Sequence, residues 1–355
     1  MRKVVYFYNC KNKYYASYPI INNFAILKDY EKIFKSYKIE LIRFLNYDNK
    51  KDSPLLLDIS YEEMLELLNK CMNILLDDID KNPYFYKKMI LLFFHPVCLD
   101  IYFNFKDKID LLRKKLGLKI IFWQDDLHFY FKNKMRGEKL ENLDKIITPS
   151  PIYFKNVNCK LYNKTKFFFY SCNFEKINEY NIKWEDREER ILLSGCCNRG
   201  YPLRHKLMKY IKKNRPDYLS FLKRPKINKF NCSAGKNIPI GLNYYEKLSK
   251  YKGAVFGYYQ YPKNFNLAKI IEILACGCIG FFEYSPLLEE ELGLKSGVHY
   301  INILDENGKL ILDDVFYKKW LKDGKKIAEN GKNYVEQHFS NTNGFKNYVK
   351  ILKKL

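Results

Sequence analysis

Two polar side chains interrupt an otherwise apolar stretch in the last third of the chain. The segment LAKIIEILAC (267–276) is apolar in nearly every helical direction, and only Lys269 and Glu272 break the pattern. Residues three apart lie on one face of a helix, so the ammonium group and the carboxylate point in the same direction. Such a carboxylate could accept hydrogen bonds from two vicinal hydroxyls of a ribose while the ammonium group meets a phosphate. On the pattern alone, a structural lysine–glutamate pair is the stronger interpretation.

A second polar group follows the apolar run KIIFWQ, where Asp125, Asp126 and His128 stand within four residues. A carboxylate beside an imidazole fixes its tautomer and raises its basicity, which is the arrangement of a general base with its orienting group. The structural alternative is that one aspartate caps a helix. His95 ends the run MILLFFH and is a further candidate for a ligand-binding or catalytic role, although a lone histidine at a strand end is more often structural.

The segment SGCCNRGYPLRHK (194–206) has the pattern of a strand end, a turn and a helix start. Gly195 begins the turn, and a helix start offers free N–H groups and the positive end of the helix dipole. Arg199 and Arg204 add donors there, which predicts a diphosphate-binding site. Arginines beside a helix start are also common as plain surface residues. Neither the P-loop pattern GxxxxGK[ST] nor GxGxxG is present.

The apolar pattern predicts the elements that must position these residues. Short apolar runs alternate with amphipathic segments, as is typical of a mostly parallel sheet covered by helices. The predicted strands are VVYFY (4–8), MILLFFH (89–95), KIIFWQ (119–124), DKIITPS (144–150), KFFFYS (166–171), ILLSG (191–195), YLSFL (218–222), AVFGY (254–258) and CIGFFE (278–283). The predicted helices are 61–79, 108–117, 201–213, 243–253 and one that begins after Asn266. The polar segment 173–190 separates two such halves, so we expect an α/β fold of two Rossmann-like domains facing each other. Ligands should then bind outside the carboxyl ends of the strands.

Composition agrees with this organisation and limits the partners. A chain of 355 residues exceeds the size at which a single core usually stops growing. Its net charge of +23 suggests a solvated basic surface first, a phosphate-binding cleft second and a nucleic-acid groove third. The ten cysteines show neither CxxC nor zinc-ligand spacing, so we expect free thiols, no metal site and a reducing, cytoplasmic location. No apolar run is long enough to span a membrane.

Three segments resemble a known family. The block AKIIEILACGCIGFFEYSPLLEE resembles the K-x-x-E-x-x-A-x-G block of GT-B glycosyltransferases, in particular the group related to the spore-maturation CgeB-like enzymes. The segment AENGKNYVEQHFSNTNGFKNYVKIL is similar to the closing helices of the same block, and FWQDDLHFY with NLDKIITPSPIYFK resembles their first domain. The resemblance covers roughly residues 120 to 355.

The resemblance implies a division of labour between the domains. The C-terminal domain would bind a nucleotide sugar, with Glu272 on the ribose and the helix start at Lys269 on the diphosphate. Retaining relatives carry a second glutamate eight positions earlier, where this chain has Asn264. That departure favours an inverting reaction with a base from the N-terminal domain, for which His128 and the neighbouring aspartates are the candidates.

These inferences combine into one expected function with two alternatives. We expect a metal-independent glycosyltransferase without a cofactor, which moves a sugar from a nucleoside-diphosphate donor (UDP or GDP) to a glycan, protein or lipid acceptor. Residues 1–175 would bind the acceptor, 176–338 the nucleotide sugar, and the terminal helix 339–355 would pack back on the first domain or contact a membrane surface. Nucleic acid is not an expected partner. The alternatives are a basic nucleic-acid-binding protein and a non-catalytic GT-B binding module.

The donor site would be formed by Gly195, Arg199, Arg204, Asn264, Lys269 and Glu272.

Overall fold

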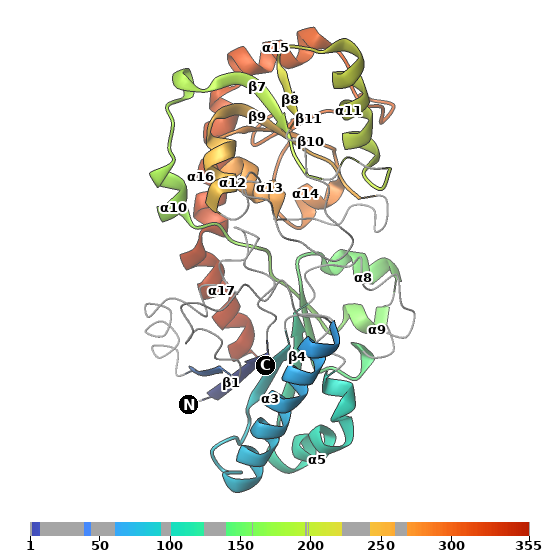
Figure 1. Cartoon of the computed structure of the whole chain (residues 1–355), viewed down its shortest axis with the longest axis vertical. Helices are drawn as coiled ribbons and strands as arrows, with labels where there is room; N and C mark the ends of the chain where they lie inside the picture. Colours follow the sequence, from blue (N-terminus) through green and yellow to red (C-terminus); the bar gives the residue numbers. More distant parts are fainter. Residues whose placement is uncertain are drawn as a thin grey trace. The chain divides into compact units, whose positions relative to one another are not determined.

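The computed structural model describes residues 2–7, 39–43, 61–93, 101–123, 140–157, 159–195, 197, 199–221, 242–259 and 268–354. The chain divides into two compact units (Figure 1). Of the described residues, those up to Phe168 and those from Asn347 onward belong to unit 1, and residues 169–346 belong to unit 2. The chain therefore passes from unit 1 to unit 2 after Phe168 and returns after Lys346.

Unit 1 is built on a parallel sheet with the strand order β2-β1-β3-β4-β5-β6. Its strands are β1 (Arg2–Phe7), β2 (Ile39–Arg43), β3 (Ile90–Phe93), β4 (Lys119–Trp123), β5 (Lys145–Thr148) and β6 (Thr165–Phe167). Its helices are α3 (Tyr61–Lys81), α5 (Lys106–Leu116), α8 (Pro151–Val157) and α9 (Cys159–Tyr162). Strands β3 and β4 are continuous apolar runs because helices cover both faces of a parallel sheet.

Unit 2 contains a second parallel sheet, with the order β8-β7-β9-β10-β11. Its strands are β7 (Glu188–Leu193), β8 (Leu219–Phe221), β9 (Tyr251–Phe256), β10 (Ile279–Phe282) and β11 (Ile301–Asn302). Its helices are α10 (Phe174–Glu179), the 3-10 turn η2 (Trp184–Asp186), α11 (Pro202–Asn214), α12 (Leu242–Ser249), α13 (Lys269–Ala275), α14 (Pro286–Glu290), α15 (Asp314–Asp323) and α16 (Lys325–Phe339). The strand order reverses between β7 and β9, and such a switch point is where ligands bind in open parallel sheets.

Alternation along the strands of unit 2 fills two separate cores. Leu192 and Phe256 point into the core formed with α10, α12, α13, α14 and α16, whereas Leu193 and Val255 point into the core formed with α11 and α15. Successive side chains of a strand face opposite ways, so these two cores lie on opposite faces of the sheet (Figure 1). The result is a three-layer α/β/α unit. The prediction of an α/β fold with two Rossmann-like domains is confirmed.

Helix α17 (Asn341–Lys353) begins in unit 2 and ends in unit 1. At the start of α17, the segment that leads into unit 2 is hydrogen-bonded to the segment that leads out of it. Cys172 N donates to Phe339 O at 2.8 Å, and Asn341 N donates to Cys172 O at 3.0 Å. At its end, the ring of Tyr348 lies 5.7 Å from that of Trp123 and 5.4 Å from that of Phe168. The last turns of α17 therefore complete the core of unit 1.

Most predicted elements differ from the structure by a few residues at their ends, and three segments differ more. Strand β6 is shorter than predicted, because residues 168–171 leave the sheet although their side chains are buried. The predicted helix 243–253 ends at Ser249, and β9 begins at Tyr251. The polar segment 173–190, predicted as a connection, contains α10 and the beginning of β7.

Buried cysteines behave as the sequence predicts. Cys172, Cys197, Cys276 and Cys278 are free and buried. The thiol of Cys278 donates to Leu248 O at 3.2 Å, and burial raises its pKa to about 11. These thiols are unreactive packing groups.

Candidate functional site

The strongest candidate site lies at the carboxyl end of β7, at the switch point of the unit 2 sheet. Ser194 and Gly195 directly follow the strand, and Gly195 has φ +86°. That left-handed conformation suits glycine, because a side chain would clash with its own backbone there. The turn brings the backbone back toward the first turn of α11.

Two cations converge on this turn from different helices. Arg204 Nη1, in the first turn of α11, donates to Ser194 O at 3.4 Å, and Lys269 Nζ, at the beginning of α13, donates to the same oxygen at 3.3 Å. A Cβ added to Gly195 would lie 2.8 Å from Arg204 Nη1 and 2.8 Å from Lys269 Nζ. Two positive groups held this close repel each other, and a bound anion removes that repulsion. The arrangement can therefore bind a phosphate or another anion.

Ser194 and Tyr244 fix the position of the lysine. Lys269 Nζ donates to Ser194 Oγ at 3.2 Å, and Ser194 Oγ is hydrogen-bonded to the Tyr244 hydroxyl at 2.8 Å. The ammonium group also lies 5.5 Å from the centre of the Tyr244 ring. Burial raises the pKa of the Tyr244 hydroxyl, and the negative charge of Glu272 raises it further, so the hydroxyl keeps its proton. Lys269 is thus held in place before any ligand binds.

Glu272 places a buried carboxylate in the same helical turn as Lys269. Its exposed fraction is 6 %, and its charge acts on the hydroxyls of Tyr244 and Tyr245 and on the thiol of Cys172. The sequence pattern placed this residue in the second turn of a helix that begins after Asn266. The helix begins instead at Lys269, so Glu272 lies in its first turn. A carboxylate in that turn is stabilised by the positive end of the helix dipole.

Aromatic rings support the arginine. The guanidinium group of Arg204 lies 3.5 Å from the centre of the Tyr201 ring, and the side chain is 4 % exposed. Tyr201 in turn meets Tyr259, which follows β9, edge to face at 4.9 Å between ring centres. His205 Nδ1 is hydrogen-bonded to Cys197 O at 2.9 Å and closes the turn. Arg204 is therefore fixed by stacking as well as by hydrogen bonding.

A further carboxylate stands at the same edge of the sheet. Glu283 directly follows β10, and its Oε2 accepts a hydrogen bond from Tyr258 N at 2.8 Å. Glu283, Ser194, Tyr201 and Tyr244 are not among the residues predicted from the sequence. Glu283 and Ser194 each follow an apolar strand directly, and this position is a sequence signal for a ligand-binding residue. The two tyrosines have no such signal.

The structure brings Gly195, Arg204 and Lys269 together, with Glu272 in the same helical turn as Lys269. Arg199 lies in the turn before α11 and is exposed. His95, Asp125, Asp126, His128 and Asn264 lie outside the described residues. Their predicted roles stay predictions.

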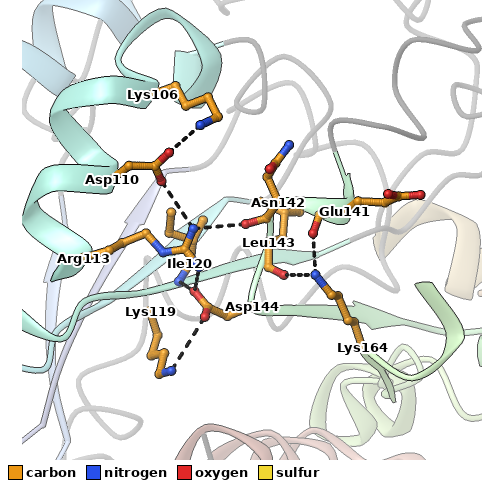
Figure 2. Close-up of polar contacts among 10 residues, drawn as sticks. All are labelled: Lys106, Asp110, Arg113, Lys119, Ile120, Glu141, Asn142, Leu143, Asp144 and Lys164. Atoms are coloured by element: carbon orange, nitrogen blue, oxygen red, sulfur yellow. Dashed lines mark hydrogen bonds and ion pairs between the residues drawn. The ribbon is translucent and has the colours of Figure 1, made fainter. Parts of the chain in front are cut away.

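A polar network in unit 1 has a structural explanation (Figure 2). The Asp144 carboxylate accepts from Ile120 N at 2.7 Å and pairs with the Arg113 guanidinium at 3.0 Å, and that guanidinium donates to Asn142 O at 3.1 Å. Asp110 and Lys106 of α5 extend the network. It lies at the amino ends of β4 and β5, the edge opposite to the one where ligands bind, and it joins α5 to the sheet.

Comparison with known proteins gives the fold a name. No family model matches the chain, and no curated protein matches it. Several solved structures match over 99 % of this chain. An alpha-glucosyltransferase in complex with UDP and a 13-mer DNA containing a central A:G mismatch has a TM-score of 0.56 at 15 % identity, with 100 % of its own chain covered. The chain has the GT-B glycosyltransferase fold.

Two further GT-B structures agree with this assignment. An alpha-glucosyltransferase in complex with UDP-glucose and DNA containing an abasic site has a TM-score of 0.54 at 14 % identity, with 99 % of its chain covered. An alpha-glucosyltransferase in complex with UDP has the same score and identity, with 100 % of its chain covered. Within the described part of this GT-B chain, no helix is long and apolar enough to cross a membrane, and no three His, Cys, Asp or Glu side chains gather to hold a metal ion.

Proposed function

We propose that the chain is a glycosyltransferase that binds a UDP-sugar in unit 2. The observation that carries the proposal is the convergence of Arg204 and Lys269 beside Gly195, at the switch point of a GT-B sheet. GT-B neighbours that match the whole chain hold UDP or UDP-glucose, which favours UDP over GDP. The CgeB-like segments make that group the nearest subtype in our proposal.

Each residue of the site has a role in this proposal. Arg204 and Lys269 bind the diphosphate, and Glu272 accepts hydrogen bonds from the two ribose hydroxyls. As the sugar leaves, negative charge grows on the diphosphate, and the two fixed cations stabilise it without moving. Fixed cations at this position can perform the charge stabilisation that a metal ion performs elsewhere, so the proposed reaction is metal-independent.

Calorimetry with UDP tests the donor site. Replacing Glu272 with Ala removes charge-assisted hydrogen bonds of about 1.5–3 kcal/mol, so UDP affinity should fall roughly tenfold or more. Glu290, an exposed carboxylate of α14, provides the matched control, and Glu290→Ala should bind UDP like the wild type. Unchanged UDP affinity in a folded Glu272→Ala protein would reject the assignment. A UDP-sugar hydrolysis screen separates an enzyme from a non-catalytic binding module, which binds UDP but releases no sugar.

For the reaction itself we propose inversion, with His128 as the base and Asp125 or Asp126 as its orienting group. Asn264 stands where a retaining relative has glutamate, which supports this choice. General-base assistance contributes about 10² to 10⁴ in rate, so His128→Ala should lower kcat by that factor and leave UDP affinity unchanged. Nuclear magnetic resonance of the product should show an inverted anomer. A retained anomer, or near-normal turnover in both His128→Ala and Asp126→Ala, contradicts the mechanism.

A second candidate concerns the acceptor. The net charge of +23 suits a polyanion, and two of the GT-B neighbours are complexes with DNA. We therefore propose DNA as the acceptor, in place of the glycan, protein or lipid that the sequence suggested. Internal nucleotides of ordinary DNA carry no free hydroxyl, so the acceptor would be a base that bears one. Transfer of radiolabelled sugar to a duplex with a hydroxymethylated pyrimidine, and not to the unmodified duplex, is the expected result; transfer to neither duplex rejects DNA as the acceptor.

A further inference from the structure

The charged side chains of helix α11 are all basic. Its sequence PLRHKLMKYIKKN contains no acidic residue. Lys206, Lys209, Lys212 and Lys213 are all exposed, and we call these four side chains the α11 basic face. The buried apolar residues of the same helix, Leu203 and Leu207, face the core of unit 2. The α11 basic face is therefore the outer surface of the helix.

Among the described residues, these four lysines have no carboxylate partner, whereas some other surface lysines do. In the part of the chain that the structure describes, none of the four forms an ion pair or a hydrogen bond. By contrast, Lys176, Lys250 and Lys318 each pair with a nearby carboxylate. Like charges three or four residues apart destabilise a helix. Lys212 and Lys213 gain from the negative end of the helix dipole, but the two lysines nearer the start of the helix do not.

The basic face has the dimensions of a short stretch of nucleic-acid backbone. The helix rises 1.5 Å per residue, so Lys206 and Lys213 are about 10 Å apart along its axis. One strand of DNA carries a phosphate about every 3.4 Å of helix axis, so the face matches roughly three phosphates. The first turn of the same helix carries Arg204, which lies at the proposed UDP site. A strand bound along α11 would thus extend directly from the donor site.

A membrane surface fits this face less well. Interfacial helices bury a broad apolar face in the lipid beside their basic residues. Apart from Pro202 at its start, the apolar side chains of α11 are buried or half-buried. A polyanion that meets only the charged outer surface needs no such apolar face.

We propose that the α11 basic face binds the phosphate backbone of DNA and holds the acceptor strand beside the donor site. This inference rests on the proposed glycosyltransferase function and on DNA as its acceptor. It adds the surface and the residues that bind the acceptor, which neither of those proposals specifies.

The test replaces Lys209, Lys212 and Lys213 together with glutamine, which keeps helix propensity and removes three charges. Fluorescence anisotropy measures binding to a 20-base-pair duplex between 50 and 200 mM salt. The slope of log affinity against log salt should fall in magnitude by about 2.7, which is about 0.9 per lost phosphate contact. Affinity at 100 mM salt should fall at least about tenfold. UDP affinity, measured by calorimetry, should not change.

The control variant replaces Lys87, Lys114 and Lys115 with glutamine. These exposed lysines precede β3 and β4 at the amino end of the unit 1 sheet. Their replacement removes the same total charge as the α11 variant. An equal loss of slope in this control overturns the inference, because the charge effect would then be general. A wild-type protein that binds UDP but not DNA also overturns it, and the donor-site proposal survives. If the α11 variant binds DNA normally but no longer co-sediments with phosphatidylserine vesicles, the face is a membrane surface and the inference is wrong.

Discussion

Replacing Gly195 with alanine is the sharpest test of the donor site, because one methyl group should displace both cations. The added Cβ would lie 2.8 Å from Arg204 Nη1 and from Lys269 Nζ, and real Cβ atoms do not approach other heavy atoms so closely. Each charge-assisted hydrogen bond lost to a phosphate costs about 1.5–3 kcal/mol. Loss of even one such bond lowers UDP affinity by roughly 10- to 100-fold, and calorimetry with UDP measures the change directly.

Gly297 provides a control, because it has a similar left-handed backbone conformation and an added Cβ there would meet no other atom of the described residues. Its φ is +75°, close to the +86° of Gly195, and an added Cβ there meets nothing within 4 Å. Both alanine variants should lose stability through backbone strain of about 1–2 kcal/mol. Only Gly195→Ala should also lose UDP affinity. If the two variants bind UDP equally well, the cations beside Gly195 do not hold the diphosphate and the donor-site reasoning is refuted.

Three further predictions concern individual contacts within unit 2. Tyr244→Phe removes the hydroxyl that helps to position Lys269 through Ser194, so calorimetry should show UDP affinity reduced about two- to tenfold without loss of the folded state. Two tyrosine hydroxyls donate to the Asp314 carboxylate and lower its pKa; this stabilisation is present above about pH 4 and is lost as the pH falls through the lowered pKa. The Tm difference between wild type and Asp314→Asn should therefore shrink from pH 7 to pH 3, and a constant difference would contradict the assignment. Arg187→Met leaves three backbone carbonyls without the guanidinium that binds them, two of them at the end of α13, so urea unfolding should show a loss of about 3 kcal/mol or more.

The sequence predicted the sheets better than the points where the chain leaves them. Continuous apolar runs located β3, β4, β5, β7 and β10 because strands buried on both faces have no polar alternation. The run KFFFYS predicted a strand of six residues, but Phe168 is apolar because it packs against Trp123 and Tyr348. An apolar run indicates that a segment is buried, but a buried segment outside a strand has the same apolar sequence as a buried strand.

The start of α13 and the end of α12 show a second limit. Asn266 suggested a helix start on cap preference, whereas the helix begins at Lys269. Similarly, the helical pattern predicted a helix that continues to residue 253, whereas Lys252 lies in β9 and pairs with Glu189 of the neighbouring strand. A cross-strand ion pair is set by a residue far away in the sequence, so a local pattern does not contain it.

The candidate site was predictable only in part, because local patterns show helix starts but not which elements lie side by side. Arg204 and Lys269 could be singled out because each stands at a predicted helix start, where anions bind. Their convergence on one carbonyl oxygen depends on the strand order, which places β7 next to β9. Tyr244 contributes from a third helix and has no local signal. The packing of α12 beside β7, and not the residue type, makes Tyr244 part of the site.

The order of the chain has a consequence for synthesis. Residues 347–355 belong to unit 1, yet residues 169–346 of unit 2 are made before them. At about 5–20 residues per second, roughly 9 to 36 s pass between the synthesis of Phe168 and that of Tyr348, the ring that packs against both Phe168 and Trp123. Unit 2 can complete its sheet during that interval while unit 1 still exposes an aromatic surface. On the ribosome, the half of the protein that begins first is therefore finished last, and the exposed aromatic surface is the place where a chaperone would bind the nascent chain.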